Sequence, residues 1–438
     1  MKEIFNPKSI AVIGASRYKG KVGHDVFKNL LKSKKKVFPV NPNANKILGK
    51  KAYSSVLDIK EKIDLAVIAV PANIVPNVVK ECGEKGVKAV IIISSGFSEI
   101  GNKDLENKVM VIAKAHNMKV LGPNCLGIIN PYQKLNASFF NKMPLKGDIA
   151  FISQSGALGV AVLDWAIQNK VGFSSFVSVG NCADIKIPDL VEYFGEDKKT
   201  KAICIYLESL KNGKRFMEIA KKIKKPIIVL KGGLTEKGQK AATTHTAALA
   251  SSAEIYKGAF KQSGVLQVDN LHQLFEVARH YACCKIPTNK RGLIITNAGG
   301  VGVLASDAFE KNGLEIVELP EKIIKNLNKV LPKHWSHSNP IDIIGDATPK
   351  RYKDVLKIIE KERFYDFVFI ALTPQTMTNP EEVARIVVRF NKKTKIPCFT
   401  CFMGGDAVRK AKKILKENKI LNFKEPGYGA EVIAKMII

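Results

Sequence analysis

A histidine surrounded by small residues is the first feature of this chain that could do chemistry. His245 lies in the stretch TTHTAALA, residues 243–250, after the strand-like run PIIVLKGG and a loop rich in glycine, lysine and threonine. A phosphorylatable imidazole needs room for a phosphoryl group, backbone N–H donors nearby and no bulky neighbour, and this segment suits those needs. Taken alone, the pattern also fits an ordinary core or surface histidine.

Two further motifs could serve a phosphoryl-carrying histidine. In ISQSGALG, Ser153, Ser155 and Gly156 would present hydroxyl and N–H groups at a helix start, where anions bind. A structural cap is the alternative, and a serine-hydrolase elbow would require glycine at Ser153. The apolar run AICIYLES ends in Glu208. A carboxylate at a strand tip can orient one nitrogen of a histidine so that the other attacks phosphorus, although a surface glutamate is equally compatible with the pattern.

The first turn of the chain suggests a nucleotide site. The segment VIGASRYKGKVG places Gly14, Ser16 and Gly20 between a strand and a helix. Small residues there let N–H groups approach a pyrophosphate, although the spacing is not GxGxxG. The second strand ends VNPNANK, without the acidic residue that holds the ribose of NAD and with a lysine at Lys46. A ligand with an extra ribose phosphate, such as coenzyme A, therefore fits better than NAD, and an ordinary tight turn is the alternative.

Apolar strand-like runs alternate with amphipathic helical stretches along the chain, a pattern typical of parallel α/β domains. The 438 residues are enough for about three domains of ~150 residues. We expect these domains at residues 1–130, 146–286 and 290–438, with the polar stretch 130–148 as a linker. Ligands of such sheets bind at the carboxyl ends of the strands, where these runs end in small residues.

Composition narrows the class of protein. The net charge of +30 would suit a nucleic-acid binder, yet only nine of the 70 basic residues are Arg, which base and bidentate phosphate contacts favour. We therefore expect no nucleic-acid partner. No apolar run reaches ~18 residues and no signal-peptide layout opens the chain, so we expect a cytoplasmic protein without a membrane span. The eight cysteines lack a metal-type double CxxC, which favours reduced thiols and no metal site.

The chain resembles the α subunits of the archaeal ADP-forming acetyl-CoA synthetases and, more distantly, of succinyl-CoA synthetase. The motifs that carry this resemblance agree in identity, order and spacing over essentially the whole chain: FNPKSIAVIGASR, VNPN, AVPA, SSGF, GPNCLG, SQSGAL, SVGN, YLES, THTAALA, NAGGVGVLASDA, NPIDIIGDA and LTPQTMTNP. The resemblance implies an α/β fold, with an N-terminal Rossmann-like CoA-binding domain followed by two flavodoxin-like, succinyl-CoA synthetase-like parallel-sheet domains.

The same resemblance implies an ADP-forming acid–CoA ligase, in which acyl-CoA, ADP and phosphate give acid, ATP and CoA reversibly. His245 would be the transient phosphohistidine and Glu208 its orienting carboxylate, while Ser153, Ser155 and Gly156 would form the phosphate-binding turn. The candidate CoA-binding residues all lie at strand ends of the first domain or beside them: Gly14, Ser16, Gly20, Lys21, Val40, Pro42, Lys46, Pro71, Ser94, Ser95, Gly96 and Asn124.

Two positions depart from the family pattern. Ala247 replaces the glycine of HTGALA, and Val301 replaces the proline that usually follows NAGG. Neither change removes a catalytic group, although Ala247 narrows the conformational freedom of its loop.

We find no ATP-grasp module in the sequence. The resemblance therefore implies a separate ATP-grasp β subunit, in an α2β2 assembly, that would carry ADP or ATP with Mg²⁺. Two alternatives come from other classes: a non-catalytic CoA- or nucleotide-binding regulatory protein, and an NAD(P)-dependent oxidoreductase. The presence of both His245 and Glu208 disfavours the first, and VNPN disfavours the second. No short motif selects the acyl group.

Overall fold

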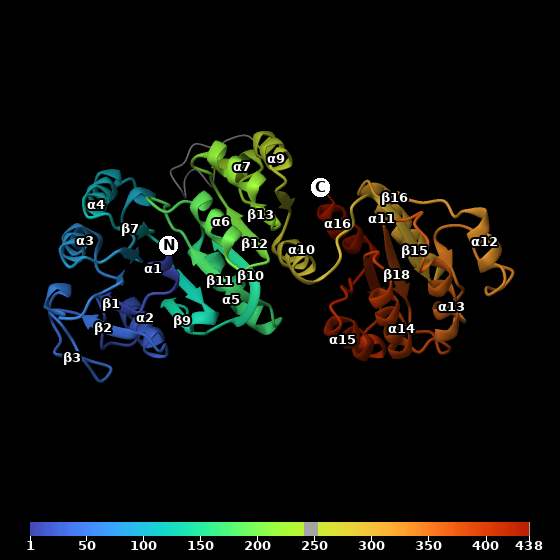
Figure 1. Cartoon of the computed structure of the whole chain (residues 1–438), viewed down its shortest axis with the longest axis horizontal. Coiled ribbons are helices and arrows are strands. Elements are labelled where there is room, and N and C mark those ends of the chain that lie inside the picture. Colours follow the sequence, from blue (N-terminus) through green and yellow to red (C-terminus); the bar gives the residue numbers. More distant parts are fainter. Residues whose placement is uncertain (241–252, 438) are drawn as a thin grey trace. The chain divides into compact units, whose positions relative to one another are not determined.

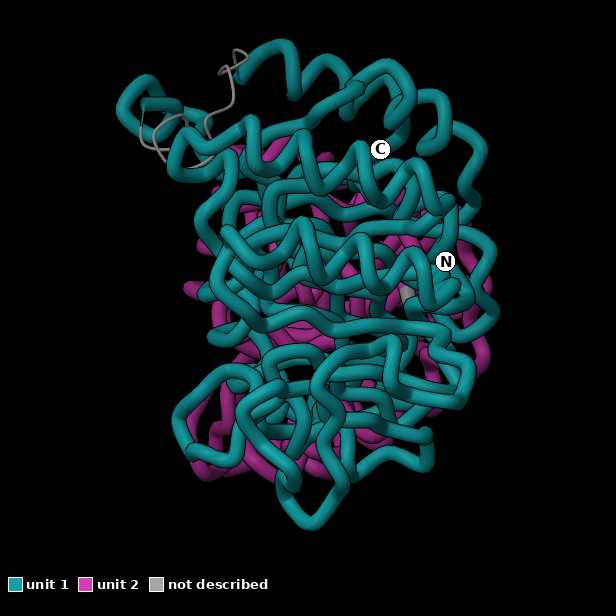
Figure 2. Tube along the Cα trace, turned by 90° about the vertical axis from the view of Figure 1, so that its left-hand side faces the viewer, with its two compact units in different colours: residues 1–274 teal, residues 275–438 magenta. Residues whose placement is uncertain are grey.

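The computed structural model describes residues 1–240 and 253–437. His245, Ala247 and the whole stretch 243–250 lie outside the described residues. The chain divides into two compact units, Met1–Leu274 and Phe275–Ile438, which Figure 2 colours separately. Strands alternate with helices through both units (Figure 1), as the alternating apolar pattern predicts.

The first sheet has five strands and lies in the N-terminal part of unit 1. They are β1 (Ser9–Ile13), β2 (Lys36–Val40), β5 (Leu65–Ile68), β6 (Ala89–Ile92) and β7 (Lys119–Leu121). All are parallel, in the order β2-β1-β5-β6-β7, so the strand order reverses between β1 and β5. Ligands of doubly wound sheets bind at such a switch point, outside the carboxyl ends of the strands.

Three helices connect these strands: α2 (Val22–Leu31), α3 (Val75–Glu84) and α4 (Lys103–Ala115). The short helix α1 (Lys2–Phe5) precedes β1, and a small hairpin of β3 (Lys46–Ile47) and β4 (Lys50–Lys51) follows β2. The residues of β1, β5 and β6 are all buried, because helices cover both faces of a parallel sheet.

The second sheet of unit 1 has seven strands in the order β14-β13-β12-β10-β11-β8-β9. They are β8 (Gly127–Asn130), β9 (Leu135–Ser138), β10 (Leu145–Ser153), β11 (Gly172–Ser178), β12 (Ala202–Leu207), β13 (Ile227–Lys231) and β14 (Leu266–Val268). The strands β10 to β14 run parallel, whereas β8 pairs antiparallel with β11 and β9. The accompanying helices are α5 (Gly156–Gln168), α6 (Ile187–Glu196), α7 (Gly213–Lys222), α9 (Ala253–Gln262) and α10 (Leu271–Cys283), the last of which continues into unit 2.

The prediction of a linker at residues 130–148 is wrong, because this stretch contains β9 and the start of β10. Two of its polar residues are buried in the fold. Asn136 and Ser138 are 3% and 0% exposed, and the Ser138 hydroxyl donates to Asn136 Oδ1 at 2.6 Å. The Asn29 amide of α2 also donates to the carbonyl of Ser138 at 3.0 Å. Polar composition does not indicate a linker here, because these buried polar side chains form hydrogen bonds with one another and with the backbone.

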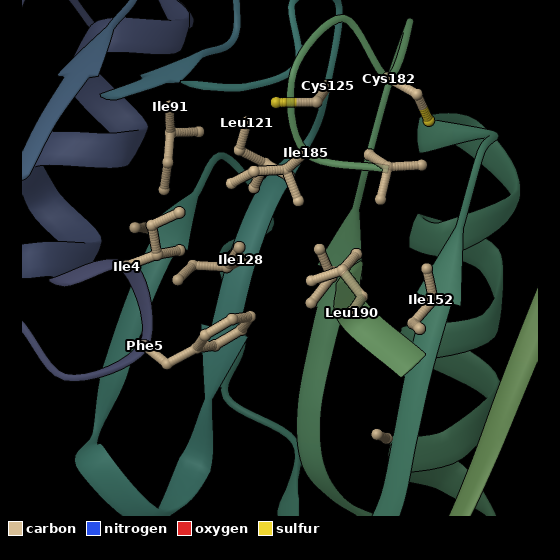
Figure 3. Close-up of a cluster of buried hydrophobic side chains, with 14 of the residues drawn as sticks. Ile4, Phe5, Ile91, Leu121, Cys125, Ile128, Ile152, Cys182, Ile185 and Leu190 are labelled. Carbon is tan, nitrogen blue, oxygen red and sulfur yellow. The ribbon is translucent and has the colours of Figure 1, made fainter. Parts of the chain in front are cut away.

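The two sheets of unit 1 share one hydrophobic cluster. Figure 3 shows side chains from α1, β6, β8, β10 and α6 gathered in it, among them Phe5, Ile91, Ile128, Ile152 and Leu190. Because apolar burial supplies most of the driving force for folding, this shared core ties the two sheets into one unit.

Unit 2 contains a third parallel sheet in the order β16-β15-β18-β19, with β17 also paired to β15. Its strands are β15 (Arg291–Thr296), β16 (Glu315–Ile316), β17 (Ile341–Asp342), β18 (Phe367–Leu372) and β19 (Cys398–Phe402). Its helices are α11 (Gly299–Lys311), α12 (Glu321–Leu327), α13 (Pro349–Ile359), α14 (Pro380–Lys393), α15 (Arg409–Glu417) and α16 (Pro426–Met436). The NAGGVG motif forms the turn from β15 into α11, where Val301 is buried.

Over residues 1–240 and 253–437, no helix is both long and apolar enough to cross a membrane. In the same part of the chain, no group of three or more His, Cys, Asp and Glu side chains is placed to hold a metal ion.

Candidate active site at the carboxyl edges of the first two sheets

The turn between β1 and α2 requires glycine at two positions. Gly14 has a φ of +87°, and a Cβ at this position would lie 2.3 Å from the carbonyl oxygen of Ala69. Gly23, in the first turn of α2, would place a Cβ 1.9 Å from the carbonyl oxygen of Gly14. The backbones at the end of the strand, at the start of the helix and beside the neighbouring strand are therefore in direct contact. This is the close approach that a phosphate-binding turn needs.

The other candidate CoA-binding residues come to the same edge of the sheet. Val40 ends β2, and Pro71, Ser94 and Asn124 follow β5, β6 and β7 within three residues. Parallel strands bring their carboxyl ends to one edge, so residues far apart in sequence become neighbours. Exposed cations of this region include Lys21, which precedes α2, and Lys46 on β3.

The end of β2 presents an amide in place of a carboxylate. Asn41 follows β2 directly, and its Nδ2 donates to the carbonyl of Ala15 at 2.8 Å. This side chain braces the first turn, and it offers no acidic group to bind ribose hydroxyls in the manner of NAD enzymes.

Polar side chains join the first sheet to the second. Asn181 lies in the loop after β11, and its Nδ2 donates to Glu99 Oε2 at 2.6 Å and to Glu106 Oε2 at 2.8 Å. Asn124 in turn donates to Asn181 Oδ1 at 3.3 Å. Burial alone would raise the pKa of Glu99, but hydrogen bonds from Asn181 and from the backbone of Gly96 hold this pKa below its ordinary value. The Gly96 N–H is thus already bonded to a carboxylate.

The SQSG motif forms a turn from β10 into α5. Ser153 is fully buried, and its hydroxyl donates to the carbonyl of Ser155 at 2.7 Å, which closes the turn. Ser155 is the N-cap of α5, and its Oγ accepts the N–H of Leu158 at 3.2 Å. A Cβ at Gly156 would meet its nearest neighbour at 3.7 Å, an ordinary contact, so packing does not require glycine there. The turn presents a capped helix start, where negative charge is stabilised.

Glu208 lies beside this turn, because β12 pairs with β10 in the second sheet. The amide of Gln154, between the two serines, accepts the N–H groups of Glu208 and Ser209 at 2.5 and 2.9 Å. It also donates to the carbonyl of Ser209 at 2.9 Å. The structure thus brings the phosphate-turn candidates and the carboxylate candidate to one edge of the sheet.

Two residues that the sequence interpretation missed surround Glu208. Lys231, the last residue of β13, is 6% exposed and donates from Nζ to the carbonyl of Glu208 at 2.8 Å. Burial lowers the pKa of Lys231, and the charge of Glu208 opposes that shift. Burial, the charge of Glu208 and a hydrogen bond to its carboxylate raise the pKa of the Tyr206 phenol to about 12. A lysine that ends an apolar strand, just before Gly-Gly, was the available signal for Lys231.

Comparisons with known proteins agree with this architecture. Three family models match the chain: a CoA binding domain at residues 8–131, a succinyl-CoA ligase like flavodoxin domain at residues 146–281, and a ligase-CoA domain at residues 292–433. A solved structure, the dinucleotide forming acetyl-coenzyme A synthetase 1 of Ca. Korarchaeum cryptofilum in complex with phosphate and ADP, matches with a TM-score of 0.91 at 38% identity, covering 99% of this chain and 96% of that one.

Two curated relatives are similar over nearly the whole chain. The ADP-forming acetate–CoA ligase of Methanocaldococcus jannaschii is 45% identical over 100% of this chain, which spans 63% of that protein's length. Subunit alpha of the ADP-forming acetate–CoA ligase I of Pyrococcus furiosus is 43% identical over 97% of this chain and 95% of its own length. With its α/β fold of CoA-binding and succinyl-CoA ligase-like domains, the chain belongs to the family of ADP-forming acetate–CoA ligases.

Proposed function

We propose that this chain is the α subunit of an ADP-forming acyl-CoA synthetase, with acetyl-CoA as the first substrate to test. The overall reaction is acyl-CoA + ADP + phosphate giving acid + ATP + CoA, in either direction. The observation that carries the proposal is a set of hydrogen bonds at the edge of the second sheet. Through them the Gln154 side chain links the SQSG turn to the strand end that bears Glu208.

The proposed chemistry has three steps. Phosphate attacks the thioester carbonyl beside the turn of Ser155 and Gly156, the C–S bond breaks, and CoA leaves as the thiol. A ring nitrogen of His245, oriented by Glu208, then attacks phosphorus of the acyl phosphate and releases the acid. The phosphohistidine finally passes its phosphoryl group to ADP. Such transfers depend on positioning and on N–H donors around the phosphoryl group more than on covalent help from the protein.

The Pyrococcus relative, named a subunit alpha, supports a second polypeptide as partner. We propose that this partner is an ATP-grasp β subunit in an α2β2 assembly, and that it binds ADP or ATP with Mg²⁺. We also propose a cytoplasmic location, where acyl-CoA, ADP and phosphate are available together.

The first experiment compares CoA with NAD. The full chain is the right sample for calorimetry, because the first sheet shares its core with the second. We expect CoA to bind, and to bind more weakly at high salt, since its phosphates supply much of the attraction to Lys21 and Lys46. Binding of NAD in place of CoA would contradict the proposal and would favour an oxidoreductase.

The second experiment follows phosphate onto the chain. Acyl-CoA and radiolabelled phosphate should leave an acid-labile, base-stable label on His245. The His245→Ala variant should lose the label and turnover but keep CoA affinity. The control variant His334→Ala, at an exposed histidine in unit 2, should leave the label, turnover and CoA affinity unchanged. Glu208→Gln should slow labelling, because a neutral amide stabilises the developing imidazolium poorly. Full activity in His245→Ala would contradict the assignment, and CoA binding without any labelling would favour a regulatory protein.

The third experiment tests the partner. The purified chain should form little ATP from acetyl-CoA, ADP and phosphate, and co-expression with a candidate ATP-grasp chain should restore ATP formation. Rapid ATP formation by the chain free of any second polypeptide would refute the split between subunits. The restored assembly can then be supplied with a series of acyl-CoAs to identify the preferred acyl group.

A further inference from the structure

Gln154 makes an unusually complete set of hydrogen bonds for one side chain. Its Oε1 accepts from two consecutive backbone N–H groups, those of Glu208 and Ser209, and its Nε2 donates to the Ser209 carbonyl. The backbone N–H of Gln154 adds a bond of 3.3 Å to the carbonyl of Tyr206. A primary amide has two donors and one two-fold acceptor, and the acceptor is filled entirely by the strand end that bears Glu208.

Lys231 holds the same strand end from the other side. Its Nζ donates to the carbonyl of Glu208 at 2.8 Å and also to the carbonyl of Gly232. The ammonium lies 4.6 Å from the centre of the Tyr256 ring, so its position is fixed by an aromatic face as well. The backbone at Glu208 is therefore held at its N–H by β10's turn and at its C=O by β13.

We propose that Gln154 is a positioning residue, which sets the Glu208 carboxylate relative to the SQSG turn, with Lys231 as the opposing brace. This inference rests on the proposed function of Glu208. A carboxylate that orients a nucleophilic imidazole must be held within about 0.5 Å of its productive position. Because Gln154 belongs to the turn itself, its side chain links the phosphate-binding element directly to the strand end that bears the orienting carboxylate.

The chemistry of the contact explains why an amide suits this position. Two partners are N–H donors, and the Ser209 carbonyl and the Cys182 sulfur are acceptors, so the side chain must both accept and donate. A glutamate at 154 would keep the two accepted bonds, lose the bond to the Ser209 carbonyl, and add a negative charge next to a turn proposed to bind phosphate. An alanine would lose all four side-chain bonds.

The test is a double-mutant cycle on the assembled enzyme. The variants are Gln154→Ala, Glu208→Gln and both together, and the readout is the rate at which labelled phosphate enters the chain from acetyl-CoA. We expect Gln154→Ala to slow labelling about 10- to 100-fold, the effect of a displacement near 1 Å, without weakening CoA binding. In the Glu208→Gln background, Gln154→Ala should slow labelling by less than about threefold further, because the carboxylate that Gln154 positions is already lost.

Asn29→Ala is the matched control. It removes two hydrogen bonds from a buried amide to the carbonyls of Ser138 and Phe140, far along the chain from Glu208, and should leave labelling unchanged. Should Gln154→Ala fail to fold, Gln154→Glu replaces it, with slower labelling and a raised KM for phosphate expected. Normal labelling in the variant that folds, or equal fold-losses in both backgrounds, would overturn the inference. Normal labelling in Glu208→Gln would instead overturn the proposed function, and this inference with it.

Discussion

The glycines of the first turn offer a test in which two physical effects separate. Gly14 combines a positive φ with a clash, since its φ is +87° and an added Cβ would lie 2.3 Å from a backbone oxygen. Gly20 has a φ of +82° with open space around it, and Gly23 has the clash, at 1.9 Å, without the positive φ. Gly20→Ala therefore measures the backbone strain alone, Gly23→Ala the steric clash alone, and Gly14→Ala both together.

The expected losses separate Gly14→Ala from the two variants that carry a single penalty. Left-handed backbone strain in Gly20→Ala costs about 1–2 kcal/mol, partly offset by about 0.4–1 kcal/mol from the stiffer unfolded chain. In Gly23→Ala the helix gains about 1 kcal/mol of propensity, but overpacking against a carbonyl that cannot rotate away costs about 1–3 kcal/mol or more. Gly14→Ala incurs both penalties and should lose about 2–5 kcal/mol, a large share of a typical domain stability of about 5–15 kcal/mol.

Hydrogen–deuterium exchange of the β1 and α2 amides is the suitable assay, because a chain of two units has no single unfolding free energy. Protection should fall most in Gly14→Ala and less in Gly20→Ala and Gly23→Ala. If Gly20→Ala were as destabilised as Gly14→Ala, or if Gly23→Ala gained protection as helix propensity alone predicts, the close approach at this turn would be refuted.

Three other predictions concern the two units separately. Gly180→Ala should lower the thermal midpoint of unit 1, since φ is +54° and the new Cβ would lie 2.0 Å from the Pro123 carbonyl oxygen; an unchanged midpoint would contradict this contact. Burial lowers the pKa of His280 to about 4, so the folded state binds fewer protons than the unfolded state and stability should fall from about pH 6.5 to about pH 4. His280→Phe should remove about 3 kcal/mol of that pH dependence in urea titrations, and an equal pH slope in both proteins would refute the assignment. Hydrogen bonds from Arg291 lower the pKa of Asp366, so this carboxylate stabilises unit 2 above its unfolded pKa of ~3.9 and loses that effect as the pH falls through its folded pKa. Asp366→Asn should therefore be less stable at pH 7, with a difference that shrinks below about pH 4; a difference independent of pH would exclude the ion pair as its cause.

Much of the fold could be predicted from local sequence pattern. Buried parallel strands are short, continuous apolar runs, so β1, β10, β15 and their neighbours are visible directly in the sequence. The strands that this pattern does not reveal are all short, namely β3, β4, β8, β9, β14 and β17. In β9 the reason is specific: Asn136 and Ser138 are buried because they bond to each other and to backbone, which composition does not reveal.

The sequence by itself determined which chemistry the chain offers. A helix start preceded by two serines, a carboxylate at a strand end and a glycine turn are local patterns, and the order of the motifs carried the family resemblance. For the same reason Ser155 was identified as the start of a helix, and the structure places it at the N-cap of α5.

Only the tertiary structure decided how these groups are held. Gln154 and Glu208 are 54 residues apart, and Asn181 and Glu99 are 82 apart. Nothing in local periodicity encodes such pairs, because they depend on strand order. With β10 beside β12 and β12 beside β13, the ends of three strands meet, and Lys231 comes within hydrogen-bond distance of the Glu208 carbonyl. Burial of apolar side chains sets that order, and the polar contacts at the sheet edge follow from it.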